Sequence, residues 1–239
     1  MWNVMGASVR GPEHRREGLA NQDAWLVRRT RETTLAVVCD GLGSRSQSAA
    51  GSRAACRAVA DSVRHWSASP GAPPDLLLRA VHALWNIRVH AAGRDESATT
   101  CLFAVITADR RLLLAQLGDG LVLLSKAGSM TTLEPSAERF GNVTTGLGIA
   151  SDLREWRIHL EPRLHEDTAV LLATDGVADD LLLERRASFL EFLVARFGAL
   201  PSGSRGRALA RELRSWPTPR HWDDKTLVVI WNDEKTELK

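Results

Sequence analysis

Three apolar, strand-like segments of this 239-residue chain end in the dipeptide Asp-Gly. They read LAVVCDG, LLLAQLGDG and AVLLATDG, and their carboxylates belong to Asp40, Asp119 and Asp175. A single Asp-Gly after a strand is typical of a turn, because both residues tolerate the backbone angles of turns. Three such ends raise a second interpretation, in which fixed carboxylates converge on one site.

Two more aspartates stand beside apolar strands, Asp23 in ANQDAW and Asp223 in HWDDKTLVV. Each alone is typical of a surface or capping residue. Carboxylates gathered at strand ends repel one another and resist ionisation unless a cation lies between them. Mg²⁺ and Mn²⁺ prefer oxygen ligands, and the glycine after Asp40, Gly41, leaves its backbone carbonyl open to a metal. No Cys or His pair at ligand spacing supports zinc, so the pattern predicts an Mg²⁺ or Mn²⁺ site.

The elements that position these acids are predicted from the spacing of apolar residues. Strands are expected at 2–8, 24–28, 35–39, 99–107, 112–117, 121–125, 155–160, 168–173 and 226–231. Amphipathic helices are expected at 47–66, 74–92, 189–197 and 205–216. Strands joined by short turns favour antiparallel sheets, and paired helices outside them favour a one-domain α+β sandwich.

Three local expectations are specific enough to compare with the structure. The strand at 35–39 is apolar throughout and is predicted to be buried on both faces. The helix at 74–92 is predicted to have Asp75 near its N-cap. Its predicted buried face consists of Leu77, Ala80, Val81, Leu84 and Ile87. Residues 134–152 form the longest irregular stretch in the first three quarters of the chain.

The composition excludes several classes of protein. Hydrophobic residues make up 44% of the chain and charged residues 25%, which is typical of a soluble globular protein. The formal net charge is +2, too small to favour nucleic acid or an anionic membrane as a partner, so the arginine clusters are interpreted as solvated surface. The three cysteines lack the spacing of a metal or redox motif, and no apolar segment is long enough for a signal peptide or membrane span. These features predict a cytoplasmic protein with buried, reduced cysteines.

Six motifs in order carry a family resemblance. They are NQDAW, VVCDGLGS, ATTCLFAVIT, LLLAQLGDGLVLL, LLATDGVADDL and DDKTLVVIW. Together they resemble the protein phosphatase 2C family of metal-dependent Ser/Thr phosphatases over residues 3–232, and most of all its compact bacterial members. The resemblance implies two antiparallel sheets flanked by helix pairs (α/β/β/α), in a single catalytic domain over residues 1–239.

The resemblance also implies roles for individual residues. Asp40 would bridge two Mn²⁺ or Mg²⁺ ions, with the Gly41 carbonyl completing one coordination shell. Asp23 would hold the second ion, partly through water. Asp175 and Asp223 would hold the other ion.

The implied reaction is hydrolysis of phosphoserine or phosphothreonine by a water that the two ions activate, with no phosphoenzyme. Asp40 and Asp175 would be the catalytic ligands, and Asp119 with Asp175 would bind a third, weaker ion. The implied partner is a phosphorylated protein, either a Ser/Thr kinase or its targets, and the expected state is a signalling monomer.

The chain departs from the family pattern at two places that matter for substrate. Leu42 stands where many eukaryotic members have a His proposed as the general acid, so either a metal-bound water or another side chain has to protonate the leaving oxygen. Gly18 stands where many members have a phosphate-binding Arg. His14, Arg15 or Arg16 could replace that Arg from the same loop, and the alternative of a solvated surface remains open for them.

Two further departures leave the metal ligands intact. Gly120 replaces the usual Ser of a Gly-Asp-Ser motif. Asp224 replaces the frequent Asn after the last metal Asp, so it adds negative charge beside Asp223.

Two other functions remain as alternatives. A haloacid-dehalogenase-type phosphatase would use Asp40 as a nucleophile, but that chemistry wants a second Asp two residues later, where Leu42 stands. A phosphatase-like domain could instead bind phosphoproteins or signal without turnover. Degenerate domains of that kind usually lose metal aspartates, and all five are present here.

Overall fold

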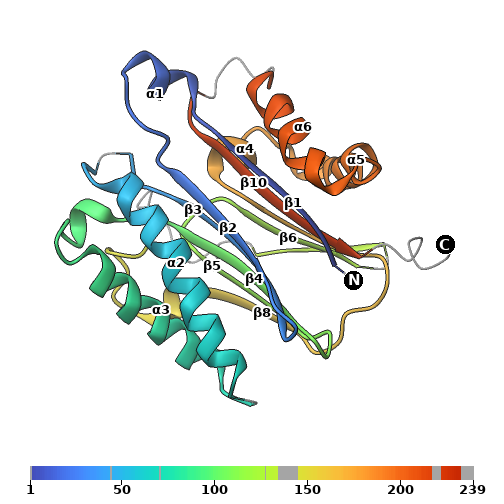
Figure 1. Cartoon of the computed structure of the whole chain (residues 1–239), viewed down its shortest axis with the longest axis horizontal. Coiled ribbons are helices and arrows are strands. Elements are labelled where there is room, and N and C mark those ends of the chain that lie inside the picture. The colour runs from blue at the N-terminus through green and yellow to red at the C-terminus, as the bar shows by residue number, and fades with distance from the viewer. Residues whose placement is uncertain are drawn as a thin grey trace.

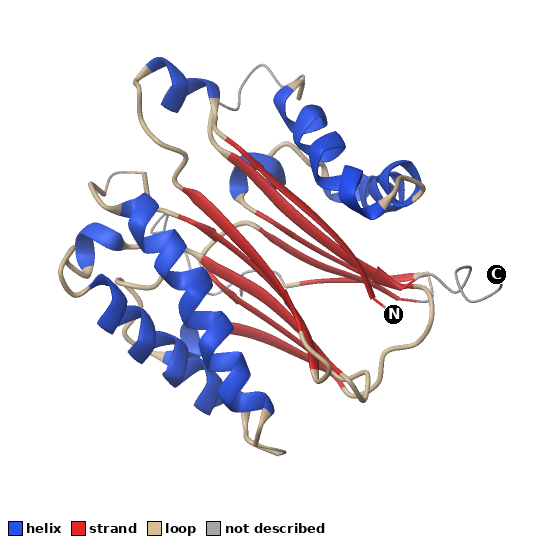
Figure 2. Cartoon of the chain, viewed as in Figure 1, coloured by secondary structure: helices blue, strands red, loops and turns tan. Residues whose placement is uncertain are grey.

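A computed structural model of the chain describes residues 2–43, 45–69, 71–126, 128–133, 145–216 and 222–232. These residues form two antiparallel five-stranded sheets that pack face to face, with helices on both outer faces (Figures 1 and 2). The α+β sandwich predicted from the sequence is therefore confirmed.

The two sheets take their strands from different parts of the chain. One sheet has the order β1 (Trp2–Val9), β10 (Lys225–Asn232), β9 (Thr168–Ala173), β6 (Leu121–Lys126) and β7 (Ser129–Thr132). The other has the order β2 (Asp23–Arg29), β3 (Thr33–Asp40), β4 (Cys101–Thr107), β5 (Leu112–Leu117) and β8 (Arg157–Glu161). We call them the β10 sheet and the β3 sheet.

The helices form two outer layers. The helices are α1 (Pro12–Arg16), α2 (Ser48–Ser67), α3 (Pro74–Val89), α4 (Asp175–Ala178), α5 (Arg186–Gly198) and α6 (Ser202–Arg214). Three short 3-10 helices lie at Asp95–Ser97, Leu153–Glu155 and Leu183–Arg185. In Figure 1, α2 and α3 cover the β3 sheet, whereas α5 and α6 cover the β10 sheet.

Three apolar clusters hold the layers together. One lies between the β3 sheet and α2 and α3, a second between the β10 sheet and α5 and α6, and a third between the two sheets. Strand β3 contributes to two of these clusters because its side chains alternate, with Val37 facing the helices and Val38 facing the other sheet. Its predicted burial on both faces is confirmed.

Helix α3 differs from its predicted face. Leu77 and Val81 are buried as expected, but Ile87 is 71% exposed. Trp85 takes part in the core instead, and its Nε1 donates to the carbonyl of Gly51 at 3.1 Å. The N-cap is Pro73, and Asp75 lies in the first turn without a side-chain capping bond.

Several local features lie outside the sequence prediction. The pattern of apolar residues did not predict β7, α1 or α4, which are short. Residues 134–144 of the predicted irregular stretch lie outside the described residues. All three cysteines are buried and free, as expected. None of the described helices combines the length and apolar character needed to cross a membrane.

Candidate metal centre

The five predicted aspartates meet at one end of the sandwich. Asp23 begins β2 and is paired in register with Asp40 at the end of β3. Asp175 follows β9 and Asp223 precedes β10, and these two strands are also neighbours. Asp119 lies in the turn that takes the chain from β5 in one sheet to β6 in the other. We call these five residues the carboxylate cluster.

Asp40 is held by the two threonines directly before β4. Its backbone N–H donates to Thr100 Oγ1 at 2.9 Å, and its carbonyl accepts from Thr99 Oγ1 at 2.7 Å and from the N–H of Thr100 at 2.8 Å. Both threonines are fully buried. The backbone is therefore fixed on both sides of the Asp40 Cα, the atom that carries the side chain.

Asp23 connects the two sheets. Thr174, at the end of β9, donates its hydroxyl proton to Asp23 Oδ2 at 3.0 Å and accepts from the N–H of Thr226 at 3.1 Å. Sequence reasoning missed Thr99, Thr100 and Thr174. Their signal was the pair of threonines directly before the strand in ATTCL and the threonine directly after the strand in ATDG, which becomes informative only when the acids are known to converge.

Burial and mutual repulsion raise the pKa values of three of these acids. Burial raises the pKa of Asp23 to about 8, and the negative charge of Asp224 adds to the rise. Burial raises the pKa of Asp40 well above its ordinary value, with further contributions from the charges of Asp23 and Asp175. Burial raises the pKa of Asp175 to about 6, and the charge of Asp119 adds to it. Ionised together, these carboxylates are unstable without a compensating positive charge.

The cluster fits a hard divalent cation. Asp23 Oδ1 is buried and has no hydrogen-bond partner among the described residues, so it has a lone pair to offer. The side chains of Asp40 and Asp175 interact directly, which brings acids from both sheets into contact. An all-oxygen set of aspartates is what Mg²⁺ and Mn²⁺ accept, and a cation there would remove the repulsion that raises these pKa values.

Glycines allow the backbone to close around the cluster. A Cβ at Gly41 would lie 2.5 Å from the carbonyl oxygen of Ser48, and one at Gly176 would lie 2.0 Å from that of Asp224. Gly120 has φ +95°, and a Cβ there would lie 2.6 Å from the carbonyl oxygen of Ala173. A serine at position 120 would strain this turn, which is a physical reason for the departure from Gly-Asp-Ser.

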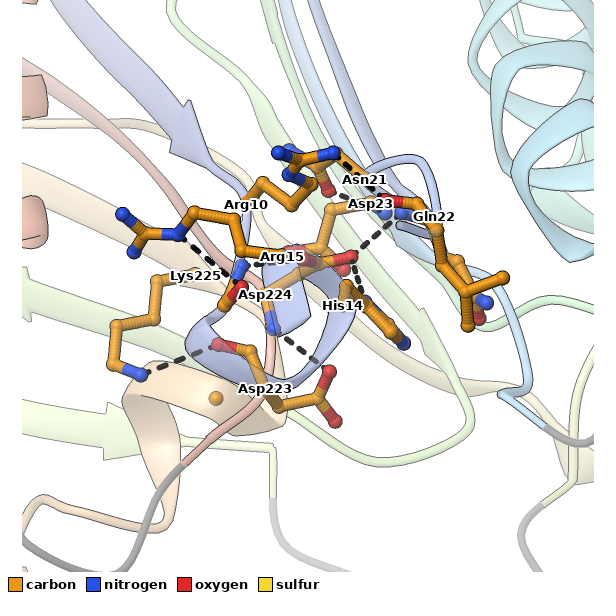
Figure 3. Close-up of polar contacts among 12 residues, drawn as sticks. Arg10, His14, Arg15, Asn21, Gln22, Asp23, Asp223, Asp224 and Lys225 are labelled. Carbon is orange, nitrogen blue, oxygen red and sulfur yellow. Dashed lines mark hydrogen bonds and ion pairs between the residues drawn. The ribbon is translucent and has the colours of Figure 1, made fainter. Parts of the chain in front are cut away.

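Asp224 lies next to the cluster but has a different environment. Its Oδ1 accepts from the N–H of Gly11 at 2.7 Å, and its Oδ2 accepts from the N–H of Gln22 at 2.6 Å and from His14 Nδ1 at 2.9 Å (Figure 3). We call Gly11, His14, Gln22 and Asp224 the Asp224 cluster. The sequence indicated only an added negative charge here, because the partners are about 200 residues away.

The predicted substrate residues lie on α1 with different environments. His14 is largely buried, with 12% of its side chain exposed, and one of its ring nitrogens lies within 4.8 Å of a carboxylate oxygen of Asp223. Arg15 and Arg16 are exposed, and Arg16 pairs with Glu13 at 2.9 Å. Gly18 has φ +72° in the turn after α1, a conformation that favours glycine over arginine.

The chain belongs to the protein phosphatase 2C family, whose sequence profile matches residues 10–216. This membership excludes the haloacid-dehalogenase alternative. No curated protein sequence gives a significant match.

Solved structures agree with the family assignment. The serine/threonine phosphatase of S. agalactiae superimposes with a TM-score of 0.68 at 15% identity, over 98% of this chain and 100% of that one. The catalytic domain of the phosphatase PstP, in complex with two manganese ions, gives 0.62 at 20% identity over 97% and 99%. RsbX, in complex with magnesium, gives 0.62 at 16% identity over 96% and 94%. At these identities the matches establish the fold.

Proposed function

We propose that the protein is a metal-dependent protein Ser/Thr phosphatase that hydrolyses phosphoserine and phosphothreonine. One observation carries this proposal: acids from both sheets converge at one end of the sandwich, where burial and repulsion disfavour their charged forms. Such a group of buried acids lowers the stability of the fold unless cations bind to it. The family membership supports the reaction class.

Asp40 would bridge two ions, Asp23 would hold one of them, and Asp175 with Asp223 would hold the other. The Gly41 carbonyl would be a further ligand, and Asp119 with Asp175 would hold a third ion. Bound Mn²⁺ or Mg²⁺ would supply a more acidic water as the nucleophile and positive charge for the phosphoryl oxygens. The threonines that hydrogen bond to Asp23 and Asp40, together with the glycines of the turns, keep the carboxylates in place.

Arg15 and Arg16 are proposed to contact the phosphorylated protein. Both are exposed on α1, beside the Asp224 cluster, where a cation can meet a phosphate or an acidic segment of the substrate. The partner would be a Ser/Thr kinase or one of its targets, and the protein would act as a monomer with one catalytic domain. Arg15→Ala should raise KM for a phosphoserine peptide several-fold with little change in kcat, whereas Arg31→Ala serves as the matched exposed control.

The test of the proposed function uses protein stripped with EDTA. Addition of Mn²⁺ should restore hydrolysis of p-nitrophenyl phosphate and of a phosphoserine peptide, and calorimetry should detect Mn²⁺ binding that Asp40→Asn weakens. Asp109→Asn is the matched control, because Asp109 is an exposed acid in the β4–β5 turn. An inactive wild type that still binds a phosphopeptide would instead support the non-catalytic binding module.

A further inference from the structure

The leaving group of a phosphoserine is an alkoxide, which is a strong base. Its departure becomes much easier when an acid delivers a proton to the leaving oxygen. Leu42 is a hydrocarbon side chain and has no proton to deliver. If the proposed function is correct, another group has to take this role.

The hydrogen bonds of His14 hold its ring in an orientation that suits proton transfer. Both oxygens of Asp224 accept backbone N–H groups, from Gly11 at 2.7 Å and from Gln22 at 2.6 Å. These two bonds fix Asp224 as an acceptor, so the Nδ1–H of His14 donates to it. The ring is therefore held by Nδ1, and its Nε2 is left for another partner.

The ring also lies beside the carboxylate cluster. One ring nitrogen of His14 is within 4.8 Å of a carboxylate oxygen of Asp223, which is exposed. The charge of Asp223 in turn acts on both Asp40 and Asp175. In Figure 3 the second ring nitrogen of His14 points away from Asp224. His14 therefore lies beside the acid that precedes β10, at the edge of the carboxylate cluster.

We propose that His14 is the general acid of the reaction and that Asp224 is its positioning residue. Nε2–H of the imidazolium gives its proton to the seryl or threonyl oxygen as the P–O bond to that oxygen breaks. The attacking water forms the new P–O bond and releases a proton to solvent, and solvent returns one proton to Nε2. The products are the free hydroxyl side chain and inorganic phosphate.

The experiment compares two leaving groups in the same enzyme. His14→Asn keeps an amide N–H that can donate to Asp224 in place of Nδ1–H, but it removes Nε2. Its kcat on a phosphoserine peptide should fall by roughly 10²-fold or more, because the alkoxide leaves without a proton. Its kcat on 2,4-dinitrophenyl phosphate should change less than about threefold, because that leaving group needs no acid.

Other outcomes contradict the proposal in distinct ways. Equal losses on both substrates would show that His14 binds phosphate or supports the fold, and no loss on either would remove it from the reaction. His90→Asn, at an exposed histidine after α3, is the matched control. His14→Gln provides a second variant if His14→Asn does not fold. A wild type inactive on both substrates would overturn the proposed function as well, so the two failures are distinguishable.

Asp224 has its own test. Asp224→Asn should reduce turnover of the phosphoserine peptide more than that of the dinitrophenyl ester, and it should cause little further loss on the peptide when His14→Asn is already present. Additive losses on both substrates would indicate a merely structural role. Without any metal, ¹⁵N NMR of the neutral His14 ring should find the proton on Nδ1 in the wild type, and a proton on Nε2 would overturn the assignment.

Discussion

Asp223 and Asp224 are adjacent in the chain, but they belong to regions that accommodate a buried acid in different ways. The Asp224 cluster surrounds one carboxylate with three donors at 2.6–2.9 Å. The carboxylate cluster places acids against one another, and Asp23 keeps a buried oxygen without a partner among the described residues. Hydrogen bonds therefore stabilise the first region as it stands, whereas the second is suited to a bound cation.

Acids of the first kind support the fold, and acids of the second kind are suited to a ligand. A satisfied carboxylate contributes to folding, and its loss leaves buried donors unpaired. A carboxylate whose pKa is raised by its neighbours reduces stability until a ligand arrives, as is common at functional sites.

The largest expected effect is on activity, from Asp40→Asn. Hydrolysis of a phosphoserine peptide with Mn²⁺ should fall by about 10³-fold, because the ligand proposed to bridge the two ions would be lost. The melting temperature without metal should stay equal or rise, since the substitution removes a repelled carboxylate from beside Asp175. Parallel assays of activity and thermal unfolding check both expectations. A variant that is inactive and also strongly destabilised would contradict the expected melting temperature.

Asp224→Ala should show the opposite pattern in stability. It leaves the N–H groups of Gly11 and Gln22 and the Nδ1–H of His14 without their acceptor, at a cost of about 3 kcal/mol. Urea unfolding without metal measures the difference, with Asp109→Ala as the exposed control. A loss below about 0.5 kcal/mol would mean that the Asp224 cluster does not stabilise the fold.

Stability without metal should fall as pH rises. Folded Asp23, with its pKa raised to about 8, and Asp175, with its pKa raised to about 6, hold protons that the unfolded chain releases near pH 4. Their contribution to stability is thus full below pH 4 and is lost as pH rises through 6 and 8, by at most about 1.4 kcal/mol per pH unit for each proton. Thermal melts should show this fall of stability with pH, and saturating Mn²⁺ should reduce it.

The variant Asp23→Asn tests the source of the pH dependence. It should flatten the slope of stability against pH above pH 6, and an unchanged slope would exclude Asp23 as its source.

The smallest effect is expected at the turn beside the carboxylate cluster. Gly120→Ser should destabilise the protein by about 1–3 kcal/mol, because its φ of +95° disfavours a side chain and its Cβ would meet Ala173. Gly203→Ser is the control, since a Cβ at that helical position meets no described atom within 4 Å. Chemical denaturation distinguishes the two, and equal stability of both variants would refute the strain argument.

The length and order of the main elements followed from local patterns. Strands β5 and β9 match their predicted bounds, because apolar runs between turn residues depend on neighbouring positions only. The face of α3 was predicted less well: Ile87 is exposed and Trp85 is buried. Helical spacing alone does not predict which of the apolar residues of α3 pack against the neighbouring α2.

By itself the sequence determined which acids stand at strand ends and therefore the kind of cation they suit. Residue type and the order of motifs carry that information, since Asp23, Asp40 and Asp175 each follow or begin a recognisable strand. Only the tertiary structure decided that Asp224 joins His14 and Gln22 rather than the cluster beside it. Its partners lie about 200 residues away, and they come within hydrogen-bond distance because β1 pairs with β10 and β2 of the other sheet packs against both strands.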